Sequence, residues 1–162
     1  MKALPLIKYP DKILLQKSSF VEKISPEIIR LLDEMAATMY ANSGIGLAAP
    51  QIGISRQFAV IDVGNGLIKM INPRIIRKIG CDTMEEGCLS LPLGFQVKVK
   101  RSKEIEVEFI DDKGEKVSMK ADGILAKAVQ HEVDHLIGIL IIDRTNPLKR
   151  ILLKKRLRLS NK

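Results

Sequence analysis

The sequence Gln130-His131-Glu132-Val133-Asp134-His135-Leu136 governs how the rest of this chain of 162 residues is interpreted. It lies in a segment predicted to be a helix, which begins around Asp122 and ends near Gly138. His131 and His135 are then one helical turn apart, so both imidazoles project from the same helix face and can bind one metal ion. They are the only histidines of the chain. The pattern predicts a metal site on a central helix.

Glu132 lies beside the two histidines, where its carboxylate can take a proton from a metal-bound water. Ile124 and Ala128 share the stripe of the two histidines at helical spacing, which predicts that this stripe faces the interior. The alternative is a structural helix whose histidines are satisfied by hydrogen bonds.

A third protein ligand is expected to come from upstream of this helix, because the only acidic residue beyond the motif, Asp143, lies eight positions past His135 and beyond the helix end. In the metzincin pattern a third histidine follows the pair, but Ile141 occupies that position. No glutamate follows Glu132, so the downstream ligand of other zinc proteases is missing as well. Cys88 and Cys81 are the candidates, because thiolates suit borderline divalent metals. Cys88 follows a glycine that permits close backbone approach, whereas Cys81 is expected to be a packed thiol; a disulfide between them is the alternative.

Periodicity predicts the remaining elements. Ser25 and Pro26 form a helix start, and apolar spacing extends that helix to about Ala41. The period then changes to two, with Val63-Gly64-Asn65-Gly66 as a hairpin turn. The segments expected to be strands are 58–62, 67–71, 96–100, 104–109 and 116–119. These elements predict an α+β fold with mainly antiparallel sheets around the central helix, an N-terminal helix and a basic C-terminal helix.

Composition indicates one globular domain, residues 1–162. Apolar residues make up 46% and charged residues 28% of the chain, which argues against disorder or a fibrous repeat. The longest uncharged apolar run covers residues 136–142, too short for a membrane span. With no recognisable secretory signal and only two cysteines, a cytoplasmic location is expected.

The net charge of +8 is concentrated at the C-terminus, because residues 148–162 contain seven basic residues and no acidic ones. Leu148, Ile151, Leu152 and Leu159 follow helical spacing, which predicts a terminal helix packed on the body with a solvated cationic face. The second hypothesis is a docking element for an anionic partner, RNA above all. No aromatic residues alternate with the basic ones, so phosphate attraction would provide most of that binding.

The segment Gly44-Ile45-Gly46-Leu47-Ala48-Ala49-Pro50-Gln51 superficially resembles a dinucleotide-binding loop. That interpretation needs a preceding strand and a following helix, but here a helix precedes and Pro50 follows. The small residues indicate backbone that approaches a substrate or metal closely. Gln51 can offer an amide N–H to a developing oxyanion. A plain tight turn is the alternative.

Together, three stretches resemble peptide deformylase. They are the glycine–alanine motif 44–51, the Glu-Gly-Cys-Leu-Ser motif 86–90 and the His-Glu-x-x-His motif within 130–135, in the order of that family. The resemblance covers nearly the whole chain. A basic C-terminal helix is similar to the common bacterial class, in which this helix is associated with docking on the ribosome.

The resemblance implies that Cys88, His131 and His135 bind one Fe²⁺ ion, with water as the fourth ligand. A set of two histidines and one cysteine also accepts Zn²⁺, Ni²⁺ or Co²⁺. The implied reaction removes the formyl group from the N-terminal formylmethionine of nascent polypeptides and releases formate. Glu132 is expected to take the proton of the attacking water and to pass one to the leaving amine.

The resemblance also implies how the substrate is held. The oxyanion is expected to meet the Gln51 amide and the Leu89 backbone N–H. The residues expected to contact the peptide are Gly44, Ile45, Gly46, Ala128 and His131. The apolar segment 91–95 departs from the family, because many members carry a long polar side chain there that reaches the substrate backbone. This departure leaves open the peptide preference and whether Phe95 lines the pocket.

Two other functions are considered. One is a metalloprotease that cleaves internal peptide bonds, which the missing downstream ligand disfavours. The other is a catalytically silent protein that binds RNA or the ribosome. The expected partners are nascent formylmethionyl peptides and the ribosome, through the basic C-terminal helix, with no membrane and no DNA.

Overall fold

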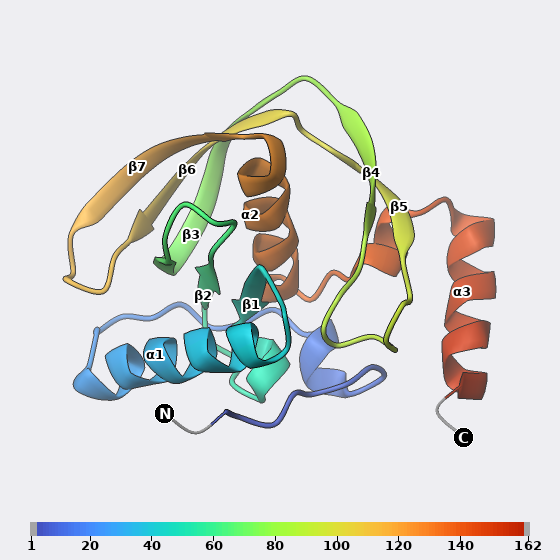
Figure 1. Ribbon diagram of the computed structural model, residues 1–162, viewed down its shortest axis with the longest axis horizontal. Coiled ribbons are helices and arrows are strands. Elements are labelled where there is room, and N and C mark those ends of the chain that lie inside the picture. Colours follow the sequence, from blue (N-terminus) through green and yellow to red (C-terminus); the bar gives the residue numbers. More distant parts are fainter. Residues whose placement is uncertain (1–2, 161–162) are drawn as a thin grey trace.

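The computed structural model describes residues 3–160 (Figure 1). Within them the helices are α1 (Pro26–Ala41), α2 (Gly123–Leu136) and α3 (Pro147–Ser160), with short 3-10 helices η1 (Lys12–Leu15), η2 (Ala49–Ile52) and η3 (Ile141–Arg144). The strands are β1 (Gly46–Ala48), β2 (Phe58–Ile61), β3 (Ile68–Ile79), β4 (Asp82–Glu86), β5 (Val97–Arg101), β6 (Glu104–Ile110) and β7 (Lys116–Asp122). A five-stranded antiparallel sheet has the order β1-β2-β3-β6-β7, and β4 and β5 form a separate antiparallel pair. This architecture confirms the α+β prediction.

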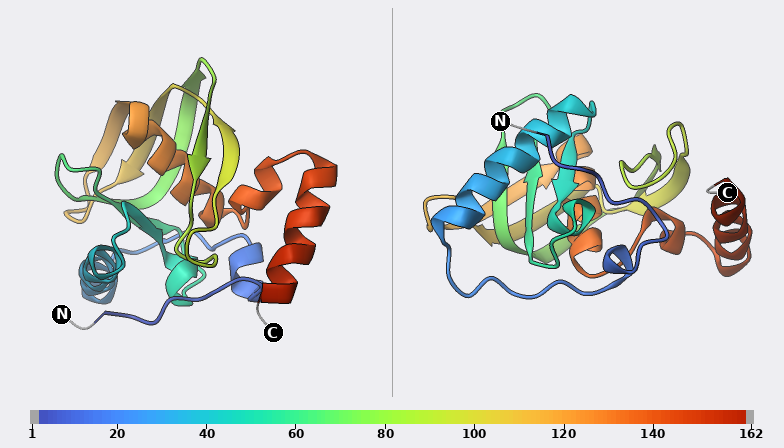
Figure 2. Two further views of the ribbon diagram at one scale, coloured as in Figure 1. Left: turned by 45° about the vertical axis from the view of Figure 1, so that its right-hand side comes forward. Right: turned by 90° about the horizontal axis from the view of Figure 1, so that it is seen from below.

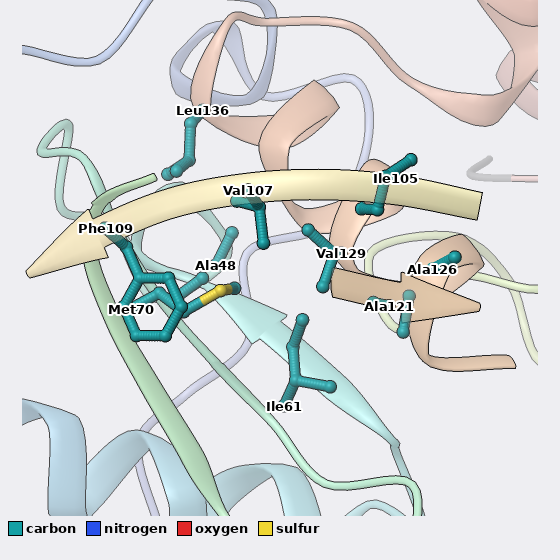
Figure 3. Packing of buried hydrophobic residues seen from close by; sticks show 12 residues of the cluster. Ala48, Ile61, Met70, Ile105, Val107, Phe109, Ala121, Ala126, Val129 and Leu136 are labelled. Carbon is teal, nitrogen blue, oxygen red and sulfur yellow. The ribbon is translucent and has the colours of Figure 1, made fainter. Parts of the chain in front are cut away.

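Strand β2 shows why α1 and α2 cover opposite faces of the five-stranded sheet. Successive residues of a strand point to opposite faces. Phe58 and Val60 pack in the apolar cluster that contains α1, whereas Ala59 and Ile61 pack in the cluster that contains α2. Figure 3 shows Ile61 and Val129 of α2 in this second cluster. All four β2 residues are buried because both faces are covered.

Both helices predicted from periodicity in the body of the chain are confirmed. The Ser25 hydroxyl accepts a hydrogen bond from the backbone N–H of Ile28 (3.4 Å) at the start of α1. α2 ends two residues before Gly138, whose φ of 75° lies in the left-handed region that glycine adopts without strain. α2 lies at the centre of the molecule, between the five-stranded sheet and the β4–β5 pair (Figure 1).

The strands were predicted in part. The hairpin pairs Ile61 with Ile68, and β5, β6 and β7 lie where alternation predicted them. β3 runs on to Ile79, beyond the predicted end. β1 and β4 were not predicted. β1 contains only Gly, Leu and Ala, and β4 is mostly polar, so neither carries an alternating pattern; β4 forms because it pairs along its whole length with β5.

Helix α3 packs on the body by a different face from the one predicted. Leu148, Ile151, Leu152 and Leu159 are exposed, so the prediction that they face the body was wrong. Leu157 is instead buried, in a third apolar cluster that holds the β4–β5 pair and η3 together. The contact is narrow, because α3 meets the molecule along one edge and otherwise stands away from it (Figure 2). The sequence of α3 contains two apolar stripes, and a narrow contact with the body can bury only one of them.

Among residues 3–160, no helix combines the length and the apolar character needed to cross a bilayer.

Candidate metal centre and active site

Three side chains from two elements converge on one point. α2 presents His131 and His135 from successive turns, and the loop after β4 brings Cys88 to them. The Cys88 Sγ lies 3.2 Å from Nε2 of His135, and the two Nε2 atoms are 3.2 Å apart. One donor atom from each residue lies within 4.8 Å of the others. Cys81 lies outside this group.

The two cysteines differ in their surroundings. Cys81 is exposed, so the prediction of a packed thiol was wrong; it lies after β3, where the chain turns toward β4 at the surface. Both cysteines are free, which also excludes the alternative disulfide. Burial raises the pKa of the Cys88 thiol, but the charges and hydrogen bonds of His135 and His131 outweigh burial and hold that pKa well below its usual range. A thiolate with two imidazoles is a donor set that fits a borderline divalent metal ion.

Glu132 lies buried beside these donors. Its Oε2 has no hydrogen-bond partner among the described residues. Such a buried polar atom is costly unless another molecule satisfies it. Burial raises the pKa of Glu132 to about 7. A carboxyl group with a pKa near neutrality can both accept and return a proton.

Gln51 is fixed so that its amide N–H points toward the metal donors. Its Oε1 accepts a hydrogen bond from the backbone N–H of Ala48 (2.8 Å). Its Nε2 therefore faces Cys88 Sγ at 3.7 Å and the hydroxyl of Ser90 at 3.3 Å. Because Gln51 is almost fully buried, this orientation is held by packing as well as by hydrogen bonds.

The loop that carries Cys88 is anchored from the N-terminal segment. The ammonium of Lys8 donates a hydrogen bond to the carbonyl of Leu89 (2.6 Å), and the backbone N–H of Tyr9 donates to the carbonyl of Ser90 (2.9 Å). These contacts fix the peptide groups next to the predicted Leu89 donor.

A buried chain of ion pairs supports the site from behind, and sequence reasoning missed it. Nδ1 of His131 lies 3.0 Å from Oε2 of Glu86. Arg101 donates two hydrogen bonds to Glu86 (2.8 and 2.9 Å) and one to Asp134 (2.6 Å). Asp134 also accepts two from Arg144.

The charges around Glu86 keep its carboxylate ionised. Burial alone would raise the pKa of Glu86, but Arg101 and His131 lower it to about 2. A signal for the chain was present in β5, where alternation places Arg101 at a buried position after Val97 and Val99. A buried cation at such a position requires a carboxylate partner.

A cleft of about 550 Å³ opens beside the metal donors. Gly44, Ile45, Gly46 and Ala128, the predicted peptide contacts, all line it, and so does Phe95. The other predicted site residues along the cleft are Gln51, Cys88, Leu89, His131 and Glu132, whereas His135 lies behind them and is buried.

Ile124 lies on the rim of this cleft and is exposed, so the prediction that it faces the interior was wrong. Ile124, Ala128 and His131 all line the cleft, so this stripe of α2 faces the cleft and not the core, which explains the difference. Leu93, at the tip of the loop between β4 and β5, lines the cleft from another side and is fully exposed.

Comparisons with known proteins agree on one family. The family model of polypeptide deformylase matches residues 3–151. The peptide deformylase of Pelotomaculum thermopropionicum is 46% identical over 155 residues, which cover 96% of this chain and 99% of that protein. A peptide deformylase from Legionella pneumophila superposes with a TM-score of 0.91 at 35% identity, over 99% of this chain and 96% of that one. The structure of peptide deformylase from Ehrlichia chaffeensis in complex with actinonin gives 0.93 at 34% identity, over 99% and 98%.

Proposed function

The chain belongs to the peptide deformylase family, and from that premise we propose that Cys88, His131 and His135 hold one Fe²⁺ ion and that Glu132 carries the proton in the reaction. The protein is a metal-dependent hydrolase that removes the formyl group from the N-terminal formylmethionine of new polypeptides and releases formate. The observation that supports the assignment is the convergence of three donor atoms within 4.8 Å. The unpartnered carboxylate of Glu132 lies beside them.

The metal donors and Glu132 have separate roles in the reaction. A divalent ion held by the three donors supplies a Lewis acid that makes water more acidic and polarises the formyl carbonyl. Glu132 accepts the proton of the water that attacks the formyl carbon. It then returns a proton to the amine nitrogen as the carbon–nitrogen bond breaks, which yields formate and a free methionine amino group.

Two N–H donors stabilise, by hydrogen bonds, the negative charge that develops on the formyl oxygen. They are Nε2 of Gln51 and the backbone N–H of Leu89. Both are held in place before the substrate arrives, Gln51 by Ala48 and the Leu89–Ser90 segment by Lys8 and Tyr9. Preorganised donors of this kind stabilise the transition state without reorganisation during the reaction.

The peptide binds in extended form along β1. β1 is an edge strand of the five-stranded sheet, so its outer side can pair with an added strand. Ile45 and Gly46 supply backbone groups at this edge, although the Ile45 carbonyl already accepts a hydrogen bond from Asp62. Gly44 lets the backbone lie close to Leu89, because a Cβ there would come within 2.8 Å of Cδ1 of Leu89. The methionine side chain lies against Ile45, Ala128 and His131.

Fe²⁺ is the proposed ion, with Zn²⁺, Ni²⁺ or Co²⁺ able to replace it at the same three donors. The soft thiolate favours these ions over Mg²⁺ or Ca²⁺, which prefer oxygen ligands.

We further propose that residues 1–162 act as a single catalytic domain in the cytoplasm and contact the ribosome through α3. Lys149, Arg150, Lys155 and Arg156 are exposed on α3. Such a cationic face suits an RNA-rich surface.

The test is formate release from formyl-Met-Ala-Ser by protein purified without oxygen, with its metal content measured. Glu132→Gln is expected to keep the metal and lose turnover, whereas Cys88→Ser is expected to lose the metal as well. Protein that carries a full complement of Fe²⁺ and releases no formate would contradict the proposal. Cleavage of casein by the same preparation would favour the metalloprotease alternative.

A further inference from the structure

A second cleft, of about 770 Å³, lies on the side of α2 opposite the metal donors. α2 contributes Gln130, Val133, Asp134 and Ile137 to this cleft, which form one helical stripe. The histidines occupy the other stripe. The cleft therefore lies on another side of the helix from the catalytic site. Arg101, Asp134 and Arg144 line it and belong to the chain of ion pairs behind His131, and its other lining residues have no part in the proposed reaction.

The walls of this cleft are strongly basic. Six of the residues that line it are basic and one is acidic. The acidic residue, Asp134, is already neutralised by Arg101 and Arg144. Arg74 pairs with Glu108, which lies outside the cleft (2.9 Å). The cleft thus carries an excess of positive charge.

Three lysines account for this excess. Lys17, Lys78 and Lys100 are exposed, and none has a carboxylate within ion-pair distance among the described side chains. They come from separate places: the segment after η1, β3 and β5. Lys78 pairs with the buried Ile105 across β3 and β6, which places it on the sheet face that packs on α2.

This concentration of charge is not a consequence of overall composition. Residues 148–162 account for seven of the eight net positive charges, so the remainder of the chain is close to neutral. Three separate segments nevertheless bring unpaired lysines to one hollow. Like charges gathered in a cleft repel one another and stabilise a bound anion.

An apolar wall completes the cleft. Phe20 lines it with 62% of its surface exposed, and Ile137 lines it with 41% exposed. An accessible aromatic ring beside unpaired cations is the combination that binds single-stranded nucleic acid, in which bases stack on rings and phosphates meet lysines.

We propose that this cleft binds a segment of single-stranded RNA. The phosphates contact Lys17, Lys78 and Lys100, and a base stacks on Phe20. The volume suits a few nucleotides of a single strand and not a duplex. An acidic peptide could pair with the lysines, but single-stranded RNA offers a base to stack on Phe20 beside a phosphate at every nucleotide, so the exposed aromatic side chain favours RNA.

The experiment measures binding of a fluorescein-labelled 12-nucleotide oligouridylate to the full-length, metal-loaded protein by fluorescence anisotropy. Lys78→Glu/Lys100→Glu is compared with Lys113→Glu/Lys120→Glu, which changes the charge equally at exposed positions on the β6–β7 turn and β7. The cleft variant is expected to bind at least about tenfold more weakly. For the cleft variant, the slope of log affinity against log salt concentration should be shallower by about 1.4, because each lost contact with a single-strand phosphate removes about 0.7 from the slope.

Stacking is tested separately. Phe20→Ala is expected to weaken binding about tenfold with an unchanged salt slope, because it removes stacking and no charge. Phe20→Leu, which keeps an apolar side chain of similar reach, should weaken it almost as much. All variants should release formate from formyl-Met-Ala-Ser at the wild-type rate, which shows that they fold. The anisotropy measurement itself does not depend on the proposed function.

Three results would overturn the proposal. The first is a control variant that loses as much affinity as the cleft variant, which would mean that net charge alone attracts the RNA. The second is displacement of the RNA by decaglutamate at equal concentration of charges, which would identify an acidic protein as the better partner. The third is uridine monophosphate that binds as tightly as the oligonucleotide, which would identify a free nucleotide as the ligand.

Discussion

Gly46 and Glu132 are in such close contact that a Cβ atom on Gly46 would lie 2.3 Å from Oε1 of Glu132 and 2.9 Å from its Cδ. Glu132 is buried against β1, so its side chain would have to shift to admit a methyl group at position 46. Position 46 therefore requires glycine, because any side chain there would clash with the Glu132 carboxylate. β1 and α2 approach each other closely at this point because the residue between them has no side chain.

Gly46→Ala is accordingly expected to displace the Glu132 carboxylate. kcat/KM for formyl-Met-Ala-Ser should fall by about 10²-fold or more, the range expected when a general base is lost, while the bound metal stays near one ion per chain. The measurement is steady-state formate release together with metal analysis. The effect should not add to that of Glu132→Gln, so the double variant should be no slower than Glu132→Gln alone. Additive losses would show that Gly46 acts through something other than this carboxylate.

Gln51 is expected to contribute to kcat and not to KM. Gln51→Glu keeps the Oε1 that accepts from Ala48 but replaces the amide donor by a carboxylate oxygen. kcat should fall about 10²-fold, as when one oxyanion donor is removed. Ser90→Ala is the control, because it removes only the hydroxyl that Nε2 of Gln51 contacts and leaves the donor in place. A loss in Ser90→Ala as large as in Gln51→Glu would indicate a structural role for both.

Arg101 and Arg74 make ion pairs of similar length with different expected effects on stability. The side chain of Arg101 is 3% exposed and that of Arg74 is 75% exposed. Arg101→Met should lower the free energy of unfolding by about 3 kcal/mol, because it leaves Glu86 buried with one partner fewer. Arg74→Met should cost less than about 1 kcal/mol, since its pair is solvated.

Urea unfolding of both variants measures the difference. Arg101→Met should also weaken metal binding about tenfold or more, because Glu86 orients His131. Equal changes in stability for the two arginine variants would contradict this assignment of the buried chain of ion pairs.

How far the sequence predicted the molecule depended on whether a pattern was local. α1 and α2 followed from helical spacing and capping, since both are set by neighbouring residues. The β1 and β4 strands could not be predicted in the same way, because small and acidic residues there become strands only by pairing with β2 and β5.

In the site, too, the features set by a local pattern were predicted and those set by distant residues were not. The spacing of His131 and His135 identified two metal ligands. The preference for Cys88 over Cys81 rested on the glycine before Cys88 and on an expected packing of Cys81 that was wrong, so it needed the family resemblance or coordinates for support. The partners of Arg101 lie 15 and 33 residues away in the chain, and no local pattern relates positions at that distance. The face by which α3 packs was predicted wrongly because two apolar stripes compete on that helix.

The contact through Leu157 is therefore expected to control how firmly α3 is held. Leu157→Ala removes a buried side chain and should cost about 2–3 kcal/mol, seen as faster amide hydrogen exchange in α3. Ile151→Ala is the matched control, because Ile151 is exposed on the same helix. Equal exchange in both variants would mean that contacts other than Leu157 hold the helix.

The apolar rim of the catalytic cleft predicts which peptides the enzyme prefers beyond methionine. Leu93, Ile124 and Ile45 come from a loop, α2 and the segment before β1, and each exposes apolar surface at the cleft. An extended peptide along β1 leaves the cleft past these side chains, and covering half of a leucine-sized surface contributes about 1 kcal/mol. Formyl-Met-Leu-Leu should therefore have a kcat/KM about five- to tenfold above that of formyl-Met-Ser-Ser. Leu93→Ser should reduce this ratio, whereas Ile76→Ser, at an exposed position on β3 outside the cleft, should leave it unchanged. A ratio near one in the wild-type enzyme would show that the peptide leaves the cleft without touching the rim.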